Sequence, residues 1–303
     1  MKQALILIGA MCLMHGNIWS QQDAHVSLYL RNPIQFNSAH AGLDGTLRAT
    51  AITRMQWTGW DGAPRTQLFS VHSPLLRSRM GGGLTVLNDE SGARNQREIM
   101  LHGAYHLPTM GSNIHGSIGL GLGLHSEGYD FQDLFTSDPG DALMIAPYAA
   151  TRFNASFGIL VHAEAWFAGY SLPQLMEHDL GDVAPMGRTL RHQYVTAGYI
   201  RPLNSFIDIR AVGLFRSVAD APNSMDLNVE CWFYDVISAG AMYRFNEGMG
   251  WQASYRFKEG WRFHYAVDFP LNGLMSRSFG SHEIGIAWDY GQKPIAFKSP
   301  RYF

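Results

Sequence analysis

Residues 251–257 read Trp-Gln-Ala-Ser-Tyr-Arg-Phe, and residues 261–269 read Trp-Arg-Phe-His-Tyr-Ala-Val-Asp-Phe. In both stretches the large apolar residues share one parity, and the polar residues take the other. This period of two is that of a β-strand whose two faces meet different surroundings. Residues 47–57 and 159–167 alternate in the same way. The pattern therefore predicts an all-β protein.

About fourteen such runs follow one another along the chain without an intervening helical stretch. Neighbouring runs should therefore pair antiparallel. An even number of strands is typical of single-chain bacterial barrels. The runs are 47–57, 66–73, 81–88, 97–106, 113–124, 147–154, 157–170, 192–201, 206–216, 225–234, 237–245, 250–257, 261–269 and 282–290.

A β-sandwich also alternates, with its apolar faces turned inward. Three features favour a transmembrane antiparallel β-barrel instead. Many runs approach the ~9–11 residues that a strand needs to cross a bilayer. Aromatic residues such as Trp57, Tyr105 and Trp288 stand at run ends, where membrane barrels carry interfacial girdles. Long connections (58–65, 125–146, 171–191 and 270–281) also tend to alternate with short ones (107–112, 155–156, 202–205 and 235–236).

The composition excludes several other classes of protein. Charged residues make up 16% of the 303 residues, well below the ~25% of soluble domains. The net charge of −2 and the absence of a strong basic run argue against a nucleic-acid partner. After Ser20 no apolar run reaches the ~18 residues expected of a membrane helix.

Four regions are expected along the chain. Residues 1–20 are typical of a cleaved signal peptide, although a lipoprotein site at Cys12 is an alternative. Residues 21–46 predict a strap or plug under or inside the barrel, or a docking surface for a periplasmic partner. Residues 47–290 form the barrel. Residues 291–303 are expected to be a periplasmic tail, unless Phe303 belongs to a barrel-insertion signal.

Parity assigns a set of polar and charged residues to the barrel lumen. They either pair with one another or line a selective pore. The small face of Ser117, Gly119, Gly121 and Gly123 would let the backbone of an inserted N-terminal segment approach. The expected lumen residues include Glu98, His102, His162, Glu164, Asp208, Arg210, Glu230, Arg244, Arg256, Arg262, His264, Asp268, Glu283 and Asp289.

Enzymatic chemistry finds little support in the sequence. No zinc-protease, nucleophile-elbow, phosphate-loop or Cys-x-x-Cys motif occurs. Ser70 and His72 share a strand face, but a barrel lipase built on them is a minor hypothesis. The acidic stretch 127–141 lacks calcium-loop spacing. No catalytic residue, cofactor or metal ligand is predicted.

The stretch Arg54-Met-Gln-Trp-Thr-Gly-Trp-Asp-Gly-Ala-Pro-Arg-Thr-Gln67 is unusually rich in aromatic and turn-forming residues. It is either a compact hairpin at the membrane interface or a rigid recognition loop. The candidate partner-binding residues are Trp57, Gly59, Trp60, Gly62, Pro64, Gln67, His72, Asn88 and Asp89.

This stretch resembles the PorP/SprF family of outer-membrane proteins of the Bacteroidota. The resemblance extends to Asn32-Pro33, residues 39–42, residues 70–74, Asn88-Asp89 with Gly92, and the closing residues 299–303. Ser38, His40 and Ser73 depart from the family's usual Pro, Tyr and Gly.

The resemblance implies an outer-membrane component of the type IX secretion and gliding machinery. Such a protein would contact outer-membrane lipid, bind or anchor secreted cargo through the cargo's C-terminal domain, and contact periplasmic ring subunits. The long connections 58–65, 125–146, 171–191 and 270–281 are then candidates for cargo contact. A general pore for small solutes is the alternative.

Overall fold

The structure is a computed structural model, and it describes residues 25–75, 79–108, 113–131, 148–179, 188–219, 221–258, 260–271 and 278–291. The predicted signal peptide lies outside these residues, as do most of the predicted C-terminal tail and residues 132–147.

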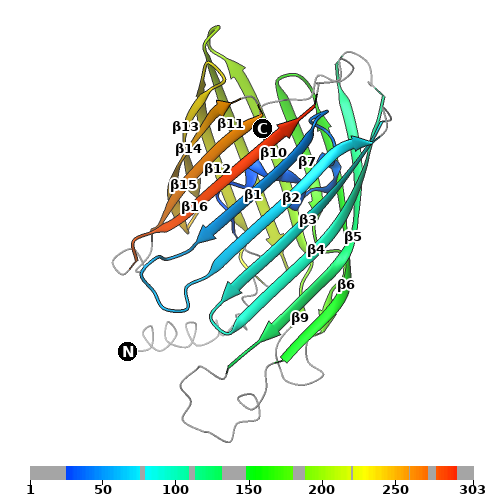
Figure 1. Ribbon diagram of the computed structural model, residues 1–303, viewed down its shortest axis with the longest axis vertical. Coiled ribbons are helices and arrows are strands. Elements are labelled where there is room, and N and C mark those ends of the chain that lie inside the picture. Colours follow the sequence, from blue (N-terminus) through cyan, green and yellow to red (C-terminus); the bar gives the residue numbers. More distant parts are fainter. Residues whose placement is uncertain are drawn as a thin grey trace, which may run out of the picture.

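Within the described residues, fourteen strands close into one antiparallel barrel (Figure 1). This confirms the predicted fold class and strand number. A separate two-stranded sheet joins β8 (His178–Asp179) and β9 (Arg188–Thr189). The barrel strands are β1 (Leu47–Met55), β2 (Arg65–Leu75), β3 (Met80–Ser91), β4 (Arg94–His106), β5 (His115–Tyr129), β6 (Tyr148–His162), β7 (Trp166–Leu172), β10 (His192–Pro202), β11 (Ile207–Val218), β12 (Ser224–Phe233), β13 (Ile237–Arg244), β14 (Gly248–Lys258), β15 (Trp261–Pro270) and β16 (Ser281–Tyr290).

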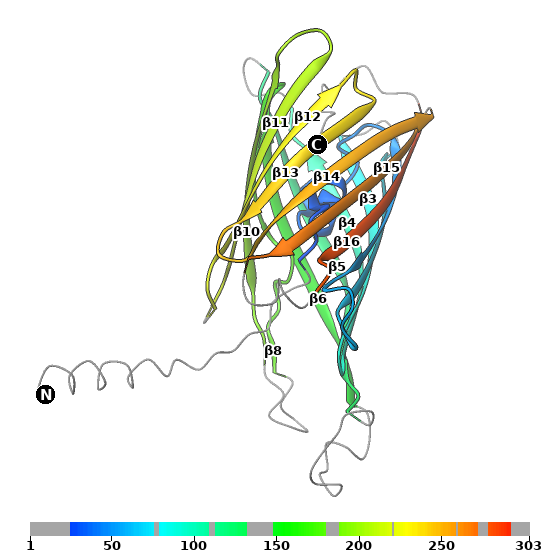
Figure 2. The same cartoon turned by 90° about the vertical axis from the view of Figure 1, so that its left-hand side faces the viewer.

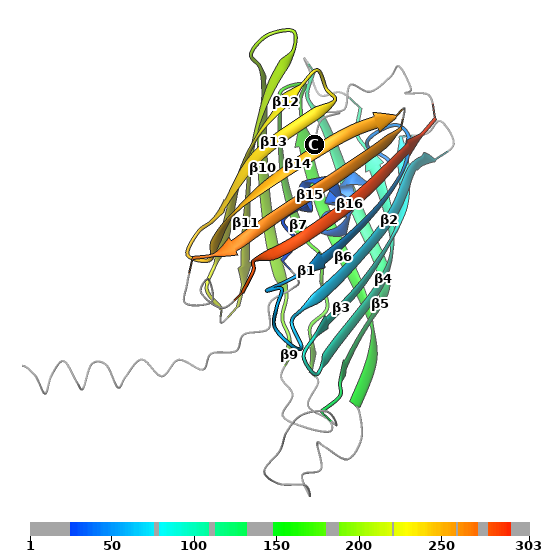
Figure 3. The ribbon, with the colours of Figure 1, turned by 60° about the vertical axis from the view of Figure 1, so that its left-hand side comes forward.

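Each barrel strand pairs with the next barrel strand along the chain, so that β7 pairs with β10, and β1 pairs with β16 to close the ring, with Leu47 opposite Tyr290. The strands slant across the barrel wall (Figures 2 and 3). We call the end that carries the β1–β2, β3–β4, β5–β6, β7–β10, β11–β12, β13–β14 and β15–β16 connections the loop end. The opposite end, which carries the β2–β3 and β6–β7 connections among others, is the turn end.

The two faces of the wall differ in polarity in the way that separates a membrane barrel from a sandwich. On β4, Leu101 faces outward and is 65% exposed, whereas the next residue, His102, faces inward and is 7% exposed. On β5, Leu120, Leu122 and Leu124 are likewise exposed. An apolar exterior around a polar interior is the reverse of a soluble fold and suits a hydrocarbon environment.

Helices contribute little to this architecture. Among the described residues, no helix has the length and apolar character needed to span a membrane.

One strand boundary predicted from the sequence is wrong. The expected turn at 155–156 lies in the middle of β6, which continues to His162, and the chain reverses at residues 163–165 instead. Glu164 therefore sits exposed in that turn, and its assignment to the lumen is also wrong. The inward-facing positions change from even in β6 to odd in β7. Leu160 and Phe167 are apolar yet face inward, so the sequence pattern does not mark this change of parity.

Residues 25–46 lie inside the barrel and form three short 3₁₀ helices, η1 (Tyr29–Arg31), η2 (Pro33–Gln35) and η3 (Ser38–His40). They appear as the blue coil enclosed by the strands in Figures 2 and 3. Leu28, Ile34, Ala39 and Ala41 are fully buried. Their partners in three apolar clusters are inward-facing wall residues, including Ile52, Leu68, Ala104, Leu160 and Leu214.

Candidate functional site

Residues 37–46 approach the wall through glycines. A Cβ added to Gly119 of β5 would lie 2.2 Å from the backbone nitrogen of Ala39. One added to Gly81 of β3 would lie 1.8 Å from the carbonyl oxygen of Ala41. Only glycine allows backbones to meet so closely. The small face expected around Gly119 therefore receives η3.

Hydrogen bonds fix the same stretch to several strands near the turn end. Ser38 Oγ lies 2.9 Å from His102 Nδ1 and 2.6 Å from Ser156 Oγ. The backbone N–H of Gly42 donates to His72 Nδ1 over 3.2 Å. These contacts reach β2, β4 and β6 at once, so the stretch is tied to a large part of the wall.

Two titratable groups at the end of this segment are tuned by burial and by one arginine. Burial lowers the pKa of His40 to about 3, so its ring is neutral. Burial alone raises the pKa of Asp44, but the neighbouring basic groups together outweigh it and keep that pKa below its usual value; chief among them is Arg48, with Nη1 at 2.8 Å. Asp44 therefore stays ionised and paired.

Residues 27 and 28 reach a cluster of wall charges near the loop end. Glu283 of β16 accepts hydrogen bonds from the backbone N–H groups of Ser27, over 2.6 Å, and Leu28, over 2.8 Å. Arg54 Nη1 donates to Glu283 and, over 2.7 Å, to Asp268. Two buried acids and one buried arginine thus bind the start of the segment.

Arg31 provides a second buried tie, to a different part of the barrel wall. Its guanidinium donates to Glu230 of β12, which also accepts from Ser238 Oγ over 2.5 Å. The same guanidinium lies 5.5 Å from the Trp232 ring centroid, and Arg210 lies 4.3 Å from it. Two arginines therefore flank one tryptophan beside one buried acid.

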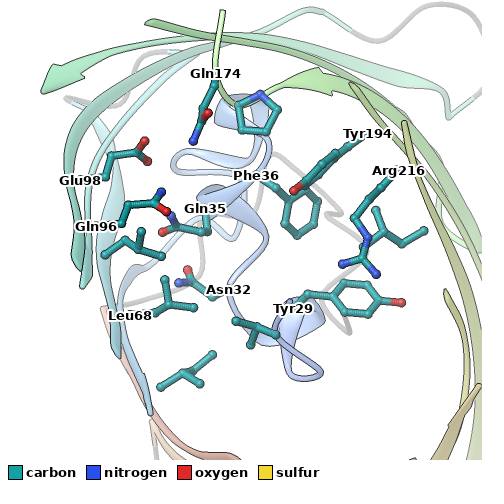
Figure 4. A pocket seen from close by; sticks show the side chains of 15 residues that line it. Tyr29, Asn32, Gln35, Phe36, Leu68, Gln96, Glu98, Gln174, Tyr194 and Arg216 are labelled. Carbon is teal, nitrogen blue, oxygen red and sulfur yellow. The ribbon is translucent and has the colours of Figure 1, made fainter. Parts of the chain in front are cut away.

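A cavity that is open to solvent lies over residues 26–36 at the loop end (Figure 4). We call it the loop-end basin. The N-terminal segment provides its floor, which consists of Val26, Tyr29, Asn32, Gln35 and Phe36. Strands β1–β4 provide one wall, with Ile52, Leu68, Leu87, Gln96 and Glu98. Strands β10 and β11 provide the other wall, with Tyr194, Leu214 and Arg216, and the rim is formed by Pro173 and Gln174. Strands from both sides of the barrel thus meet around the N-terminal segment.

The tryptophan-rich motif forms a second feature of the loop end. The Thr58 N–H donates to the Gly280 carbonyl over 2.9 Å, and the Phe279 N–H donates to the Thr58 carbonyl over 3.1 Å. Gly59 has a φ of +100° and packs against the Phe279 ring. Trp60 is 41% exposed and Phe279 is 79% exposed. We call residues 57–64 with 278–280 the aromatic platform.

The other predicted motif residues complete the picture. The N–H of Gly92, in the β3–β4 turn, donates to the Gly62 carbonyl over 3.0 Å, and the Gln56 N–H donates to the Pro64 carbonyl over 2.9 Å. Both bonds rigidify the platform, which requires the left-handed φ of +71° at Gly62.

Gln67, Asn88 and Asp89 do not join the platform surface. Asn88 Nδ2 donates to Gln67 Oε1 over 3.4 Å on the outer face, in a polar patch that also holds Arg97. Asp89 faces inward, where it accepts from Thr66 Oγ1 over 2.5 Å.

Ser70 and His72, weighed above as a hydrolase pair, are both engaged by the N-terminal segment. Ser70 Oγ donates to Asn32 Oδ1 over 2.6 Å, and His72 accepts from Gly42. Their order along β2 follows the path of that segment through the lumen.

The predicted lumen residues other than Glu164 lie on the inner side or at its rim. His162 is buried and stacks on His115 at 5.3 Å between ring centroids. His264 Nδ1 lies 2.8 Å from Ser254 Oγ. Arg256 Nη1 donates to Asp235 over 2.6 Å at the turn end. Most predicted lumen charges therefore pair with neighbours.

Sequence reasoning missed Arg31 as a functional residue. A signal was available, because Arg31 is the only Lys, Arg, Asp or Glu between residues 24 and 43. A lone charge in an apolar segment implies a buried partner. Within the described residues, no group of His, Cys, Asp or Glu is arranged to hold a metal ion.

Comparisons with known proteins agree with this fold. The sequence model of a family described as "Type IX secretion system membrane protein PorP/SprF" matches residues 18–288. A search of curated proteins gives no match. The toluene transporter TbuX of Ralstonia pickettii is 9% identical, with a TM-score of 0.52 over 84% of this chain and 91% of its own. Omp33 of Acinetobacter baumannii is 8% identical, with a TM-score of 0.48 over 82% and 100%. At such low identity, the TbuX likeness shows the fold alone.

Proposed function

Because this chain belongs to the PorP/SprF family of type IX secretion system membrane proteins, we propose that it is a non-enzymatic barrel that binds or anchors secreted cargo through the cargo's C-terminal domain. The apolar exterior and the family support an outer-membrane location. We further propose a cleaved signal peptide, contact with the periplasmic ring, and service to gliding as well as secretion.

The observation that carries the proposal is the occupied lumen. Residues 25–46 bury their apolar side chains in three clusters with the wall and add ion pairs to Glu230 and hydrogen bonds to Glu283. Each fully buried aliphatic or aromatic side chain contributes roughly 1.5–3 kcal/mol. Such a segment acts as a plug, which suits a protein that holds a partner better than one that conducts solutes.

The aromatic platform supports cargo binding at the loop end. Exposed Trp60 and Phe279 stand on a hydrogen-bonded base, so they offer large apolar contacts at little cost in conformational entropy. We infer that the loop end, with its longer connections and the platform, faces the cell exterior and that the turn end faces the periplasm, because outer-membrane barrels carry their longer loops outside.

The test is co-purification of tagged full-length protein from outer membranes. The Trp60→Ser/Phe279→Ser variant should retain at least fivefold less cargo than wild type. Tyr234→Ser is the matched control, because Tyr234 is 68% exposed but lies at the turn end. Equal cargo retention by all three proteins would place the contact elsewhere. Absence of both cargo and ring subunits would remove the secretion role.

A pore for small solutes is the second candidate, motivated by the mixed charges of the lumen. In planar bilayers the intact protein should be silent, while a variant lacking residues 25–46 should conduct. Stable conductance by the intact protein would favour the pore.

A further inference from the structure

We propose that the loop-end basin binds an extended, uncharged stretch of a partner polypeptide, with one large apolar side chain against its aliphatic wall. This inference rests on the proposed function, because the partner is the cargo chain. It adds a second place of contact besides the aromatic platform, and the chemical class of the cargo stretch that is recognised there.

The aliphatic side of the basin, formed by Ile52, Leu68 and Leu87, favours an apolar group on the ligand. Ile52, Leu68 and Leu87 stand side by side at the loop-end halves of β1, β2 and β3, and all three line the basin. Across the floor, Phe36 lies against Tyr194 with 6.1 Å between ring centroids. A polypeptide side chain fills such a slot, whereas a sugar presents hydroxyls to it.

The polar part of the lining consists largely of carboxamides. Asn32 and Gln35 rise from the floor, Gln96 stands on β4, and Gln174 lies at the rim (Figure 4). A carboxamide both donates and accepts hydrogen bonds, as a peptide backbone also does. Asn32 Oδ1 already accepts from Ser70, and Gln96 Oε1 accepts from Arg94. Asn32 Nδ2 and Gln35 Oε1 have no partner within the described residues, and this donor and acceptor match the C=O and N–H groups of an extended chain.

Several polar atoms of the lining residues have no hydrogen-bond partner within the described residues. They are Tyr29 Oη, Asn32 Nδ2, Gln35 Oε1 and Arg216 Nε. These atoms are inaccessible to solvent, and the side chains of Tyr29, Asn32 and Arg216 are buried, with Asn32 only 3% exposed. Buried polar groups in native proteins are nearly always hydrogen-bonded. A ligand that offers both donors and acceptors, together with small side-chain shifts, would supply the missing bonds.

The charged side chains of the lining are already paired. Glu98 Oε2 lies 3.3 Å from His125 Nδ1, and Arg216 Nη2 lies 2.8 Å from Asp226 Oδ2. A charged ligand would have to compete with these partners, so an uncharged stretch fits better. Below the basin, residues 37–46 are hydrogen-bonded to the wall. The bound stretch of the partner therefore enters from the loop end and extends no further than the basin.

The experiment places a photo-crosslinker in the tagged full-length protein in its native membrane. Gln96→p-benzoylphenylalanine and Gln174→p-benzoylphenylalanine probe the basin. Gln252→p-benzoylphenylalanine is the matched control, because Gln252 also faces inward but donates to Asn228 outside the basin. We expect both basin probes to crosslink to one short uncharged stretch of the co-purifying cargo. The crosslinking yield should be at least tenfold higher than that of the control.

A second pair of variants tests the aliphatic wall. Leu68→Ala should lower cargo retention at least fivefold. Met242→Ala removes a comparable buried contact with the segment outside the basin and should not lower it. Equal loss in both variants would indicate a general effect on folding and would overturn the role of the wall.

The remaining outcomes separate this inference from the proposed function. Cargo that co-purifies but crosslinks only outside the basin would overturn the basin and leave cargo binding intact. Crosslinks to lipid or polysaccharide from the basin would overturn the peptide class. Absence of cargo from the wild-type preparation would overturn both.

Discussion

At the scale of the residue, Arg31 shows how one side chain ties a segment to a wall. Its guanidinium pairs with Glu230, which lies 199 positions later in the chain, and it shares the Trp232 ring with Arg210. Both members of the pair are nearly inaccessible to solvent. Loss of one member alone leaves the other buried and poorly compensated.

Arg31→Leu should therefore lower the free energy of unfolding by about 3 kcal/mol, the size of a broken buried pair. Glu230 keeps the Ser238 hydroxyl but loses its principal cation. Arg31→Leu/Glu230→Leu should recover part of that stability, as measured by denaturant unfolding in detergent. A double variant less stable than the single one would show that the broken Arg31–Glu230 pair does not cause the loss of stability in Arg31→Leu.

At the scale of the element, glycines decide where η3 rests. Gly119 and Gly158 of β5 and β6 stand opposite each other and contact residues 37–39. A side chain at either position would occupy the space of the segment backbone. The strands at this point are therefore shaped to receive the segment as well as to pair with each other.

Gly119→Val should displace η3 and produce open-channel events in planar bilayers, because its first added atom meets the Ala39 backbone. Gly103→Val on β4 is the control, since nothing lies within 4 Å of a Cβ there. Both variants should still form heat-modifiable barrels on gels. If the Gly119→Val barrel shows no conductance, the valine is accommodated by a shift of the strands, and η3 stays in place.

At the scale of the whole molecule, the question is whether the segment stays in place while cargo is held. Ser38 Oγ and Ser156 Oγ are 2.6 Å apart, so cysteines at these positions are close enough for a disulfide. Cys231→Ser removes the only other described thiol from such an experiment.

In that background, oxidised Ser38→Cys/Ser156→Cys protein should retain cargo as well as its reduced form does. The basin and the platform both lie at the loop end, away from the disulfide between positions 38 and 156. Cargo binding there therefore requires no withdrawal of residues 37–46. Cargo retention that falls on oxidation and returns on reduction would show that residues 37–46 have to move.

The barrel and its strand number were predictable from the sequence, because alternation between two faces is a local property of each strand. The failure at residues 155–165 has another cause: Leu160 and Phe167 are apolar but face the lumen, so the change of parity between β6 and β7 leaves no polar–apolar signal in the sequence. The local nature of alternation also explains why parity assigned most lumen residues correctly but could not say what they contact.

The position of residues 25–46, the partners of Arg31 and Arg54, and the basin were decided by tertiary structure alone. Each depends on contacts that the segment and distant strands make between residues up to 256 positions apart, as between the Ser27 N–H and Glu283. Those strands meet only because the ring closes between β1 and β16. The sequence by itself therefore determined the wall and its two faces, whereas closure of the ring decided what fills it.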